Sequence, residues 1–208
     1  MRPRASVIVW LGMSDSGKPG VHHPRIPPLE REEVTGEARG AFEREWARFG
    51  RLTNMKRTLL RSPASYHALM EWYPLFDTIK AFLGERLAIV FAHAISAESD
   101  CLICTTFMRR ILMEWGEKPD ALILDEKGRA VVAFGRALVQ PGNRVPDAVY
   151  RTMEQLFSSE QIVALTAFAG LMAATNMINN ALKVDLDEYL YAFRQEQPLP
   201  ERGVKHGA

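Results

Sequence analysis

Apolar residues recur at the three- and four-residue spacing of an α-helix through most of this sequence, and glycine, proline and asparagine cluster between the periodic stretches. Outside a short N-terminal stretch, no segment alternates at the period of two that a half-buried strand requires. The sequence therefore predicts an all-α fold, a compact bundle of several helices.

The periodic segments give the expected bounds of the helices. Pro74 interrupts the third segment, and Gly36 and Gly40 weaken the first, which we expect to begin late. Ser158 and Gln161 have the spacing of a capping box before the last helix. The expected helices are residues 29–49, 54–60, 65–83, 85–98, 101–115, 127–139, 147–157 and 160–182.

A leader and a tail flank the helical region. Residues 1–27 are rich in Pro, Gly and Ser, which favours an extended or mobile leader, and residues 193–208 form a C-terminal tail. Residues 28–192 form one helical domain. Because 47% of the residues are apolar, a domain of this length can bury a substantial core.

One motif in the leader resembles a phosphate-binding loop. Gly12, Gly17 and Lys18 have the required spacing, but Pro19 stands where such a loop has the Ser or Thr that holds magnesium. The segment also continues as a loop instead of entering a helix. We therefore expect no nucleotide site there.

The charge is nearly balanced, since 26 Lys and Arg against 25 Asp and Glu give a net charge of +1. No strong field favours nucleic acid or an anionic membrane surface, so small-molecule substrates or protein partners fit better. Residues 162–174 come nearest to a membrane span, but they are too few and predict a buried core helix. With only two cysteines and no convincing secretory signal, we expect a cytoplasmic protein.

The two cysteines, Cys101 and Cys104, are one helical turn apart. This spacing places both thiols on one face, where they can form a reversible dithiol. Cys101 also falls near the start of the expected helix, where the helix dipole lowers a thiol pKa, and Ser99 or Asp100 can cap that helix. The alternative is packing, because the cysteines continue an apolar stripe through Met108. A zinc site needs four ligands, and the sequence offers no second pair, so we expect no metal and no cofactor.

The region from residue 25 to residue 192 resembles the alkyl hydroperoxidase and carboxymuconolactone decarboxylase superfamily. The resemblance lies in the CxxC that opens a helix after a short polar turn, in Asn54-Met55 and Ser62-Pro63, and in the C-terminal run. It implies an alkylhydroperoxidase D-like bundle that assembles as a dimer, trimer or hexamer, and thiol-dependent reduction of hydroperoxides. The matching residues of the C-terminal run are Phe157, Glu160, Ile162, Val163, Asn176, Asn180, Ala181, Leu182, Val184 and Leu186.

The sequence departs from the peroxidase pattern at both proton-relay positions. Peroxidase members carry a glutamate twelve residues before the first cysteine and a histidine four residues after the second, and here Ile89 and Met108 occupy these places. Cleavage of an O–O bond requires a thiolate and a proton for the leaving group, and neither residue handles protons. His93 is the main candidate substitute, beside Glu85 and Glu98, and the alternative for His93 is a hydrogen-bonded core or interface residue.

Three functions remain open from the sequence. The first is a thiol peroxidase or disulfide redox enzyme with Cys101, Cys104 and His93 as catalytic residues, recycled by a dithiol or lipoyl-type reductant protein. By family analogy Cys104 attacks and Cys101 resolves, whereas the helix start favours Cys101 as the thiolate. The second is a lactone decarboxylase, for which we identify no clear cationic cluster. The third is an oligomeric scaffold or binding protein. Asn176, Asn179 and Asn180 are candidates for a pocket wall or for amide bridges between helices.

Overall fold

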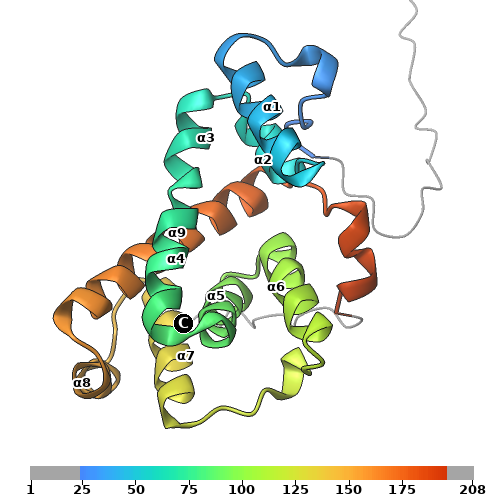
Figure 1. The fold of residues 1–208 in the computed structure, drawn as a ribbon. Coiled ribbons are helices and arrows are strands. Elements are labelled where there is room, and N and C mark those ends of the chain that lie inside the picture. The colour runs from blue at the N-terminus through green and yellow to red at the C-terminus, as the bar shows by residue number, and fades with distance from the viewer. Residues whose placement is uncertain (1–23, 196–208) are drawn as a thin grey trace, which may run out of the picture.

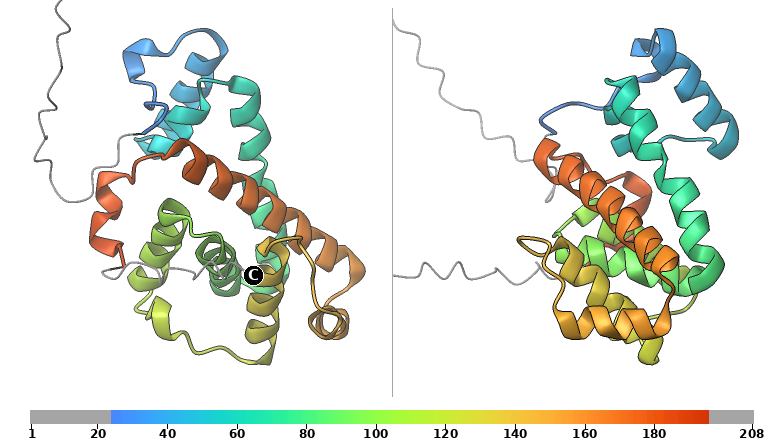
Figure 2. Two further views of the ribbon diagram at one scale, coloured as in Figure 1. Left: turned by 180° about the vertical axis from the view of Figure 1, so that it is seen from behind. Right: turned by 90° about the vertical axis from the view of Figure 1, so that its left-hand side faces the viewer.

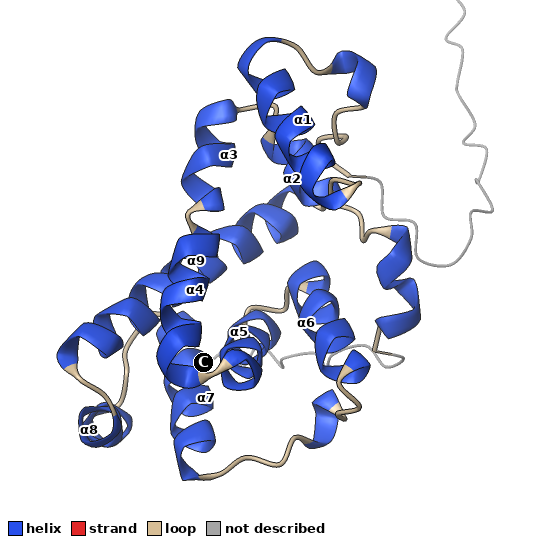
Figure 3. Ribbon diagram, in the orientation of Figure 1, coloured by secondary structure: helices blue, strands red, loops and turns tan. Residues whose placement is uncertain are grey.

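The computed structural model describes residues 24–195, and its regular secondary structure in this range is entirely helical (Figures 1 and 3), which confirms the all-α prediction. The phosphate-loop-like residues and most of the leader lie outside the described range, as does the tail beyond residue 195. The α-helices are α1 Gly36–Phe49, α2 Asn54–Leu59, α3 Pro63–Met70, α4 Trp72–Leu83, α5 Glu85–Glu98, α6 Leu102–Glu114, α7 Glu126–Val139, α8 Asp147–Leu156 and α9 Ser159–Leu182. The short 3-10 helices are η1 Arg31–Glu33, η2 Pro119–Ala121 and η3 Glu188–Phe193.

Helix α9 is the central element of the bundle. It contacts each of the helices α3 to α8, and Figure 2 shows α1, α2 and α3 at one end of it and α8 at the other. Among the described helices, α9 alone has the length and apolar composition to cross a bilayer. Its buried face, however, carries core residues such as Leu165, Phe168 and Met172. Val163 and Met177 on the opposite face are exposed in this single chain, and assembly into an oligomer stays a prediction.

Two hydrophobic clusters hold the helices together. The larger one joins α4 to α9 with η3, and rings of Trp72, Phe76, Phe91 and Phe168 stack or tilt against one another at its centre. The smaller one fixes α1, α2 and α3 against the C-terminal half of α9. Burial of each large side chain contributes about 1.5–3 kcal/mol, so the core accounts for most of the stabilisation.

The first helix begins late, as expected, at Gly36, which has a φ of 56°, a left-handed value that glycine adopts without strain. The third expected segment differs from the prediction. The segment 65–83 is divided at Glu71 instead of at Pro74, and α3 begins earlier, at Pro63. Pro74 lies in the first turn of α4, where a missing backbone N–H breaks no intrahelical hydrogen bond.

Helix ends follow the expected chemistry elsewhere. The capping box of Ser158 and Gln161 is present at the start of α9, with both reciprocal hydrogen bonds formed. Gly116 follows the end of α6 with a φ of 78°, as expected for a left-handed helix end.

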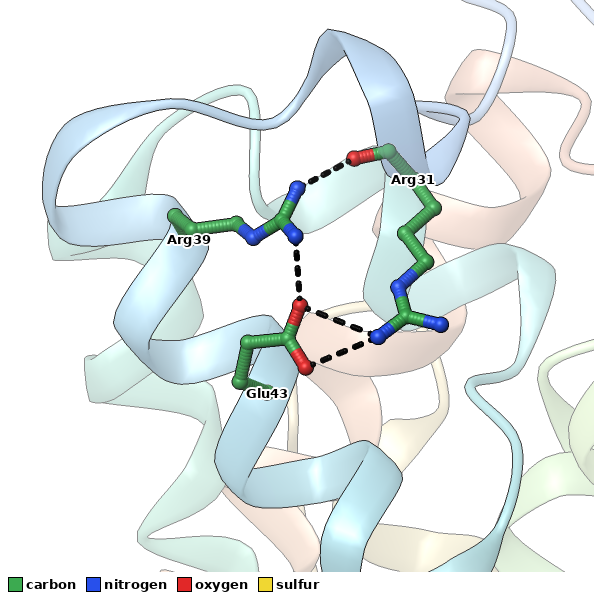
Figure 4. Close-up of polar contacts among 3 residues, drawn as sticks. All are labelled: Arg31, Arg39 and Glu43. Carbon is green, nitrogen blue, oxygen red and sulfur yellow. Dashed lines mark hydrogen bonds and ion pairs between the residues drawn. The ribbon is translucent and has the colours of Figure 1, made fainter.

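A polar cluster fixes the start of the domain to α1 (Figure 4). Glu43 accepts from Arg39 at 2.9 Å and from Arg31 at 3.2 Å, and Arg39 also donates to the backbone carbonyl of Arg31 at 2.9 Å. These side chains are exposed, so each ion pair contributes at most about 1 kcal/mol. Their main effect is to fix the direction in which η1 enters α1.

Candidate functional site

A tight turn between α5 and α6 places the cysteines. The N–H of Asp100 donates to the carbonyl of Ala97 at 3.2 Å, and the N–H of Cys101 donates to the carbonyl of Ser96 at 3.0 Å. This is a Schellman helix end with Asp100 in the left-handed position, at a φ of 49°. Because Ser99 and Asp100 complete α5, the N-cap residue of α6 is Cys101 itself, and the predicted cap by Ser99 or Asp100 was wrong.

Both cysteines are free and buried, and each shifts the pKa of the other. The Cys104 thiol lowers the pKa of Cys101, and the backbone N–H groups of Cys104 and Ile103 and the Asn179 amide lower it further against the effect of burial. The neighbouring Cys101 thiol, together with burial, raises the pKa of Cys104 well above its usual value. The two pKa values therefore move in opposite directions, and Cys101 is the sulfur that ionises first.

Asn179 of α9 is the side chain that connects the two sulfurs. Its Nδ2 lies 3.3 Å from Cys104 Sγ and 3.8 Å from Cys101 Sγ. One residue later, Asn180 Nδ2 donates to the Ser99 carbonyl at 2.9 Å and holds the turn before α6. Sequence reasoning left these amides open between pocket wall and helix bridge. The structure places Asn179 at the thiols and makes Asn180 the bridge.

A cavity of about 110 Å³ opens at Cys104. Cys104 is part of its wall, whereas Cys101 is fully buried and is not. An apolar cavity of about 150 Å³ holds a benzene-sized molecule, so this one fits the reactive end of a small substrate. The other lining residues are Thr53, Met55, Lys56, Leu69, Met70, Trp72, Tyr73, Ile103, Phe107, Met108, Met172, Thr175, Asp187 and Leu190.

A second cavity of about 300 Å³ adjoins the first, since four residues line both. Arg51, Lys56 and Arg110 bring positive charge to its wall from three separate segments. This is the cationic cluster that sequence reasoning did not identify, because Arg110 of α6 is far along the chain from Arg51 and Lys56. The residues common to both cavities are Thr53, Lys56, Tyr73 and Phe107, and the second adds Glu45, Phe49, Arg51, Arg110 and Tyr189.

The three cations of the second cavity differ in their partners. Lys56 pairs with Glu45, and Arg110 pairs with Glu114 at 3.0 Å. Arg51 forms no ion pair within residues 24–195, and its guanidinium carbon lies 3.9 Å from the centre of the Tyr189 ring. Among the described residues, Arg51 is therefore the cation of the second cavity that remains available to an anionic group of a ligand.

His93, the predicted relay residue, lies in a different cluster. Burial, with Arg109 as the next cause, lowers its pKa to about 4, and Asp120 opposes the shift. Arg109 holds Asp120 through two hydrogen bonds of 2.6 and 3.0 Å. The groups that shift the cysteine pKa values are each other, Asn179 and backbone N–H groups, and His93 is not among them.

The other positions considered for a proton relay are likewise not among the groups that shift the cysteine pKa values. Ile89 is a core residue, and Met108 lies on the wall of the first cavity. Glu85 is in the first turn of α5, and Glu98 accepts a hydrogen bond from Gln140 at 3.3 Å. Within the described range, no group of three His, Cys, Asp or Glu side chains is arranged to hold a metal ion.

The arrangement of the helices is that of the alkylhydroperoxidase D-like fold, as three solved structures show. The AhpD-core, peroxidase-related protein from Ralstonia eutropha JMP134 superposes with a TM-score of 0.67 at 18% identity, over 82% of this chain and 96% of that chain. The debrominase Bmp8 superposes with a TM-score of 0.67 at 17% identity, over 81% and 95%. A peroxidase-related protein from Silicibacter sp. TM1040 gives 0.65 at 16% identity, over 88% and 100%.

These likenesses confirm the predicted resemblance at the level of the fold. A variant of the debrominase, with a cysteine replaced by alanine, has also been solved in complex with 2,3,4-tribromopyrrole and superposes with a TM-score of 0.65. No family model and no curated protein matches the sequence. The chemistry of the chain therefore has to be argued from its own residues.

Proposed function

We propose that the protein is a thiol-dependent peroxidase that reduces a small hydroperoxide with Cys101 and Cys104. The observation that carries this proposal is a buried pair of cysteines that both accept from the Asn179 amide, with one of the two sulfurs on the wall of a small cavity. A pair of buried cysteines that only fills space needs neither the amide of Asn179 nor an opening to a cavity.

The arrangement supports Cys104 as the attacking residue, because Cys104 lines the cavity and Cys101 does not. Cys101 ionises first, and its thiolate is the base that takes the Cys104 proton when the substrate arrives. Cys104 Sγ then bonds to the outer peroxide oxygen, the O–O bond breaks and an alcohol leaves once its oxygen is protonated. Cys101 displaces hydroxide from the Cys104 sulfenic acid, and the products are water and a disulfide.

Recycling requires two electrons and two protons from outside the chain. A dithiol or lipoyl-type reductant protein supplies both by thiol–disulfide exchange. The second cavity favours substrates with an anionic group, since Arg51 lies there without a carboxylate partner in the described range. We include the homo-oligomeric state and the cytoplasmic location in the proposal, as predictions of the sequence.

A steady-state assay tests this function. With dihydrolipoamide as reductant, the wild-type protein should consume tert-butyl hydroperoxide, and Cys101→Ser and Cys104→Ser should each abolish turnover. Leu102→Ala is a matched control, because Leu102 belongs to the same motif and is exposed. Turnover that survives in both cysteine variants would refute the proposal.

Reductive debromination is a second candidate, favoured by the likeness to Bmp8 and by aromatic residues on the cavity wall. In that reaction Cys104 takes the halogen from a ring carbon, the ring gains a proton, and Cys101 displaces bromide to form the disulfide. The same two electrons leave the thiols. Bromide release from 2,3,4-tribromopyrrole without peroxide consumption would support this candidate instead.

A further inference from the structure

Asp187 has a carboxyl oxygen with no hydrogen-bond partner, on the wall of the cavity that contains Cys104. The residue is 8% exposed, and its Oδ1 accepts a hydrogen bond from the backbone N–H of Asn54 at 2.8 Å. Its Oδ2 is buried and has no hydrogen-bond partner among the described residues. A buried polar atom without a partner costs free energy, so this oxygen requires an explanation.

The surroundings of Asp187 favour its protonated form. Burial raises the pKa of Asp187, and the backbone N–H of Asn54 and the charges of Arg57 and Arg51 only partly oppose this effect. The phenol of Tyr189 is the other titratable group that interacts with it. A protonated carboxyl group in an apolar cavity has a proton to give.

No other carboxyl group lies on the described wall of this cavity. Lys56 is paired with Glu45, and the hydroxyl of Thr175 donates to the carbonyl of Leu171 at 2.8 Å. Cys104 and Asp187 therefore face one small space of about 110 Å³, one with a reactive sulfur and the other with an exchangeable proton. The two residues are supplied by the start of α6 and by the segment after α9.

We propose that Asp187 is a catalytic residue, the acid that protonates the leaving oxygen when Cys104 cleaves the peroxide bond. This inference rests on the proposed peroxidase function. It assigns to Asp187 the proton-donating role that Ile89 and Met108, at the relay positions, cannot fill. An alkoxide is a poor leaving group, and a positioned general acid increases such a rate by about 10²–10⁴-fold.

The protons and electrons of the full step balance. The proposed step begins with one proton shared by the two cysteines and with Asp187 protonated. Cys104 Sγ bonds to the outer oxygen, the O–O bond breaks, and the alkoxide takes the proton of Asp187 to leave as the alcohol. Cys101 then bonds to Cys104 Sγ, and the hydroxyl leaves with the shared proton as water. Asp187 is now ionised, and it regains its proton when the dithiol reductant delivers two electrons and two protons to the disulfide.

The test compares two peroxides with different leaving groups. Asp187→Asn keeps an oxygen that accepts from the Asn54 N–H but has no acidic proton. The probes are tert-butyl hydroperoxide, whose alkoxide needs a proton to leave, and peracetic acid, whose carboxylate does not. The readout is the rate at which the reduced thiols disappear in a stopped-flow experiment. Glu188→Gln is the control, because it removes the exposed carboxyl group next in the chain.

We expect Asp187→Asn to slow the reaction with tert-butyl hydroperoxide by about 10²–10⁴-fold, with the peracetic acid rate nearly unchanged. The peracetic acid rate also shows that the variant is folded and that its thiols are intact. Equal slowing with both probes would mean that Asp187 only positions the site, and no slowing would mean that it takes no part. Either result overturns the proposal while leaving the peroxidase function in place, whereas a wild-type protein inert to both probes overturns the function itself.

Discussion

Replacement of Asn179 by alanine should raise the pKa of Cys101, because the variant lacks the side-chain donor that contacts both sulfurs. A hydrogen bond to a charged group contributes about 1.5–3 kcal/mol, and one pKa unit corresponds to about 1.4 kcal/mol. The Nδ2 atom lies 3.3 and 3.8 Å from the sulfurs, and the longer contact is the one to Cys101. We therefore expect the lower end of the range, a rise of about one pKa unit.

The rate should change less than the amount of thiolate. A rise of one unit lowers the thiolate fraction about tenfold at a pH below the pKa. A more basic Cys101 thiolate also takes the Cys104 proton more readily, which offsets part of this loss. The two effects together predict a reaction slowed by less than about tenfold below the pKa, with recovery as the pH rises.

Thiolate absorbance near 240 nm, followed against pH, measures the pKa in the wild-type and variant proteins. Asn180→Ala is the matched control, since it also removes an amide from α9 but frees the Ser99 carbonyl instead of a sulfur. An unchanged pKa in Asn179→Ala, or an equal rise in Asn180→Ala, would refute the assignment of Asn179 to the thiols.

Three further changes test the packing, the acid response and the second cavity. Gly135→Ala should destabilise the fold by about 1–3 kcal/mol in urea unfolding, because the new Cβ would lie 2.7 Å from the Phe91 ring, and any stabilisation would contradict the packing of α5 on α7. The free energy of unfolding of the wild-type protein should fall by up to about 3 kcal/mol as the pH falls from about 6.5 to 4, because the unfolded chain binds a proton at His93 that the folded chain does not. His93→Gln should abolish this fall. Parallel curves of stability against pH for the two proteins would show the assignment to be wrong. Arg51→Gln should raise KM for a fatty acid hydroperoxide and leave KM for its methyl ester unchanged, and an equal effect on both would exclude a role of Arg51 in binding the anionic group.

The sequence predicted those parts of the fold whose signals lie within a single helix. Helical periodicity gave the helices α5 to α9 within a few residues, since each carries its own apolar face and its own end signals. The break at Glu71 was placed at Pro74, because proline inside a pattern signals a break, although the first turn of a helix accommodates it. The left-handed conformation of Asp100 was not predicted, because aspartate indicates this conformation less strongly than glycine does.

The candidate site was predictable only where its residues are close in sequence. Cys101 and Cys104 are one turn apart, so their proximity followed from helix geometry alone. Asn179 and Asp187 reach the same place from the far end of the chain, and only the packing of α9 and η3 brings them there. The same holds for the cationic cluster, whose members are isolated surface arginines and a lysine when the sequence is considered alone.

The central claim is that Cys101 and Cys104 form a working redox pair, and a stoichiometric reaction tests it most directly. The reduced protein is mixed with one equivalent of tert-butyl hydroperoxide, and peroxide and free thiols are measured together over time. We predict the loss of two thiols for each peroxide consumed, faster than with free cysteine, and a peptide mass that corresponds to the Cys101–Cys104 disulfide. Thiols that remain reduced, or that are oxidised no faster than free cysteine, would contradict the account and leave the pair as part of the core.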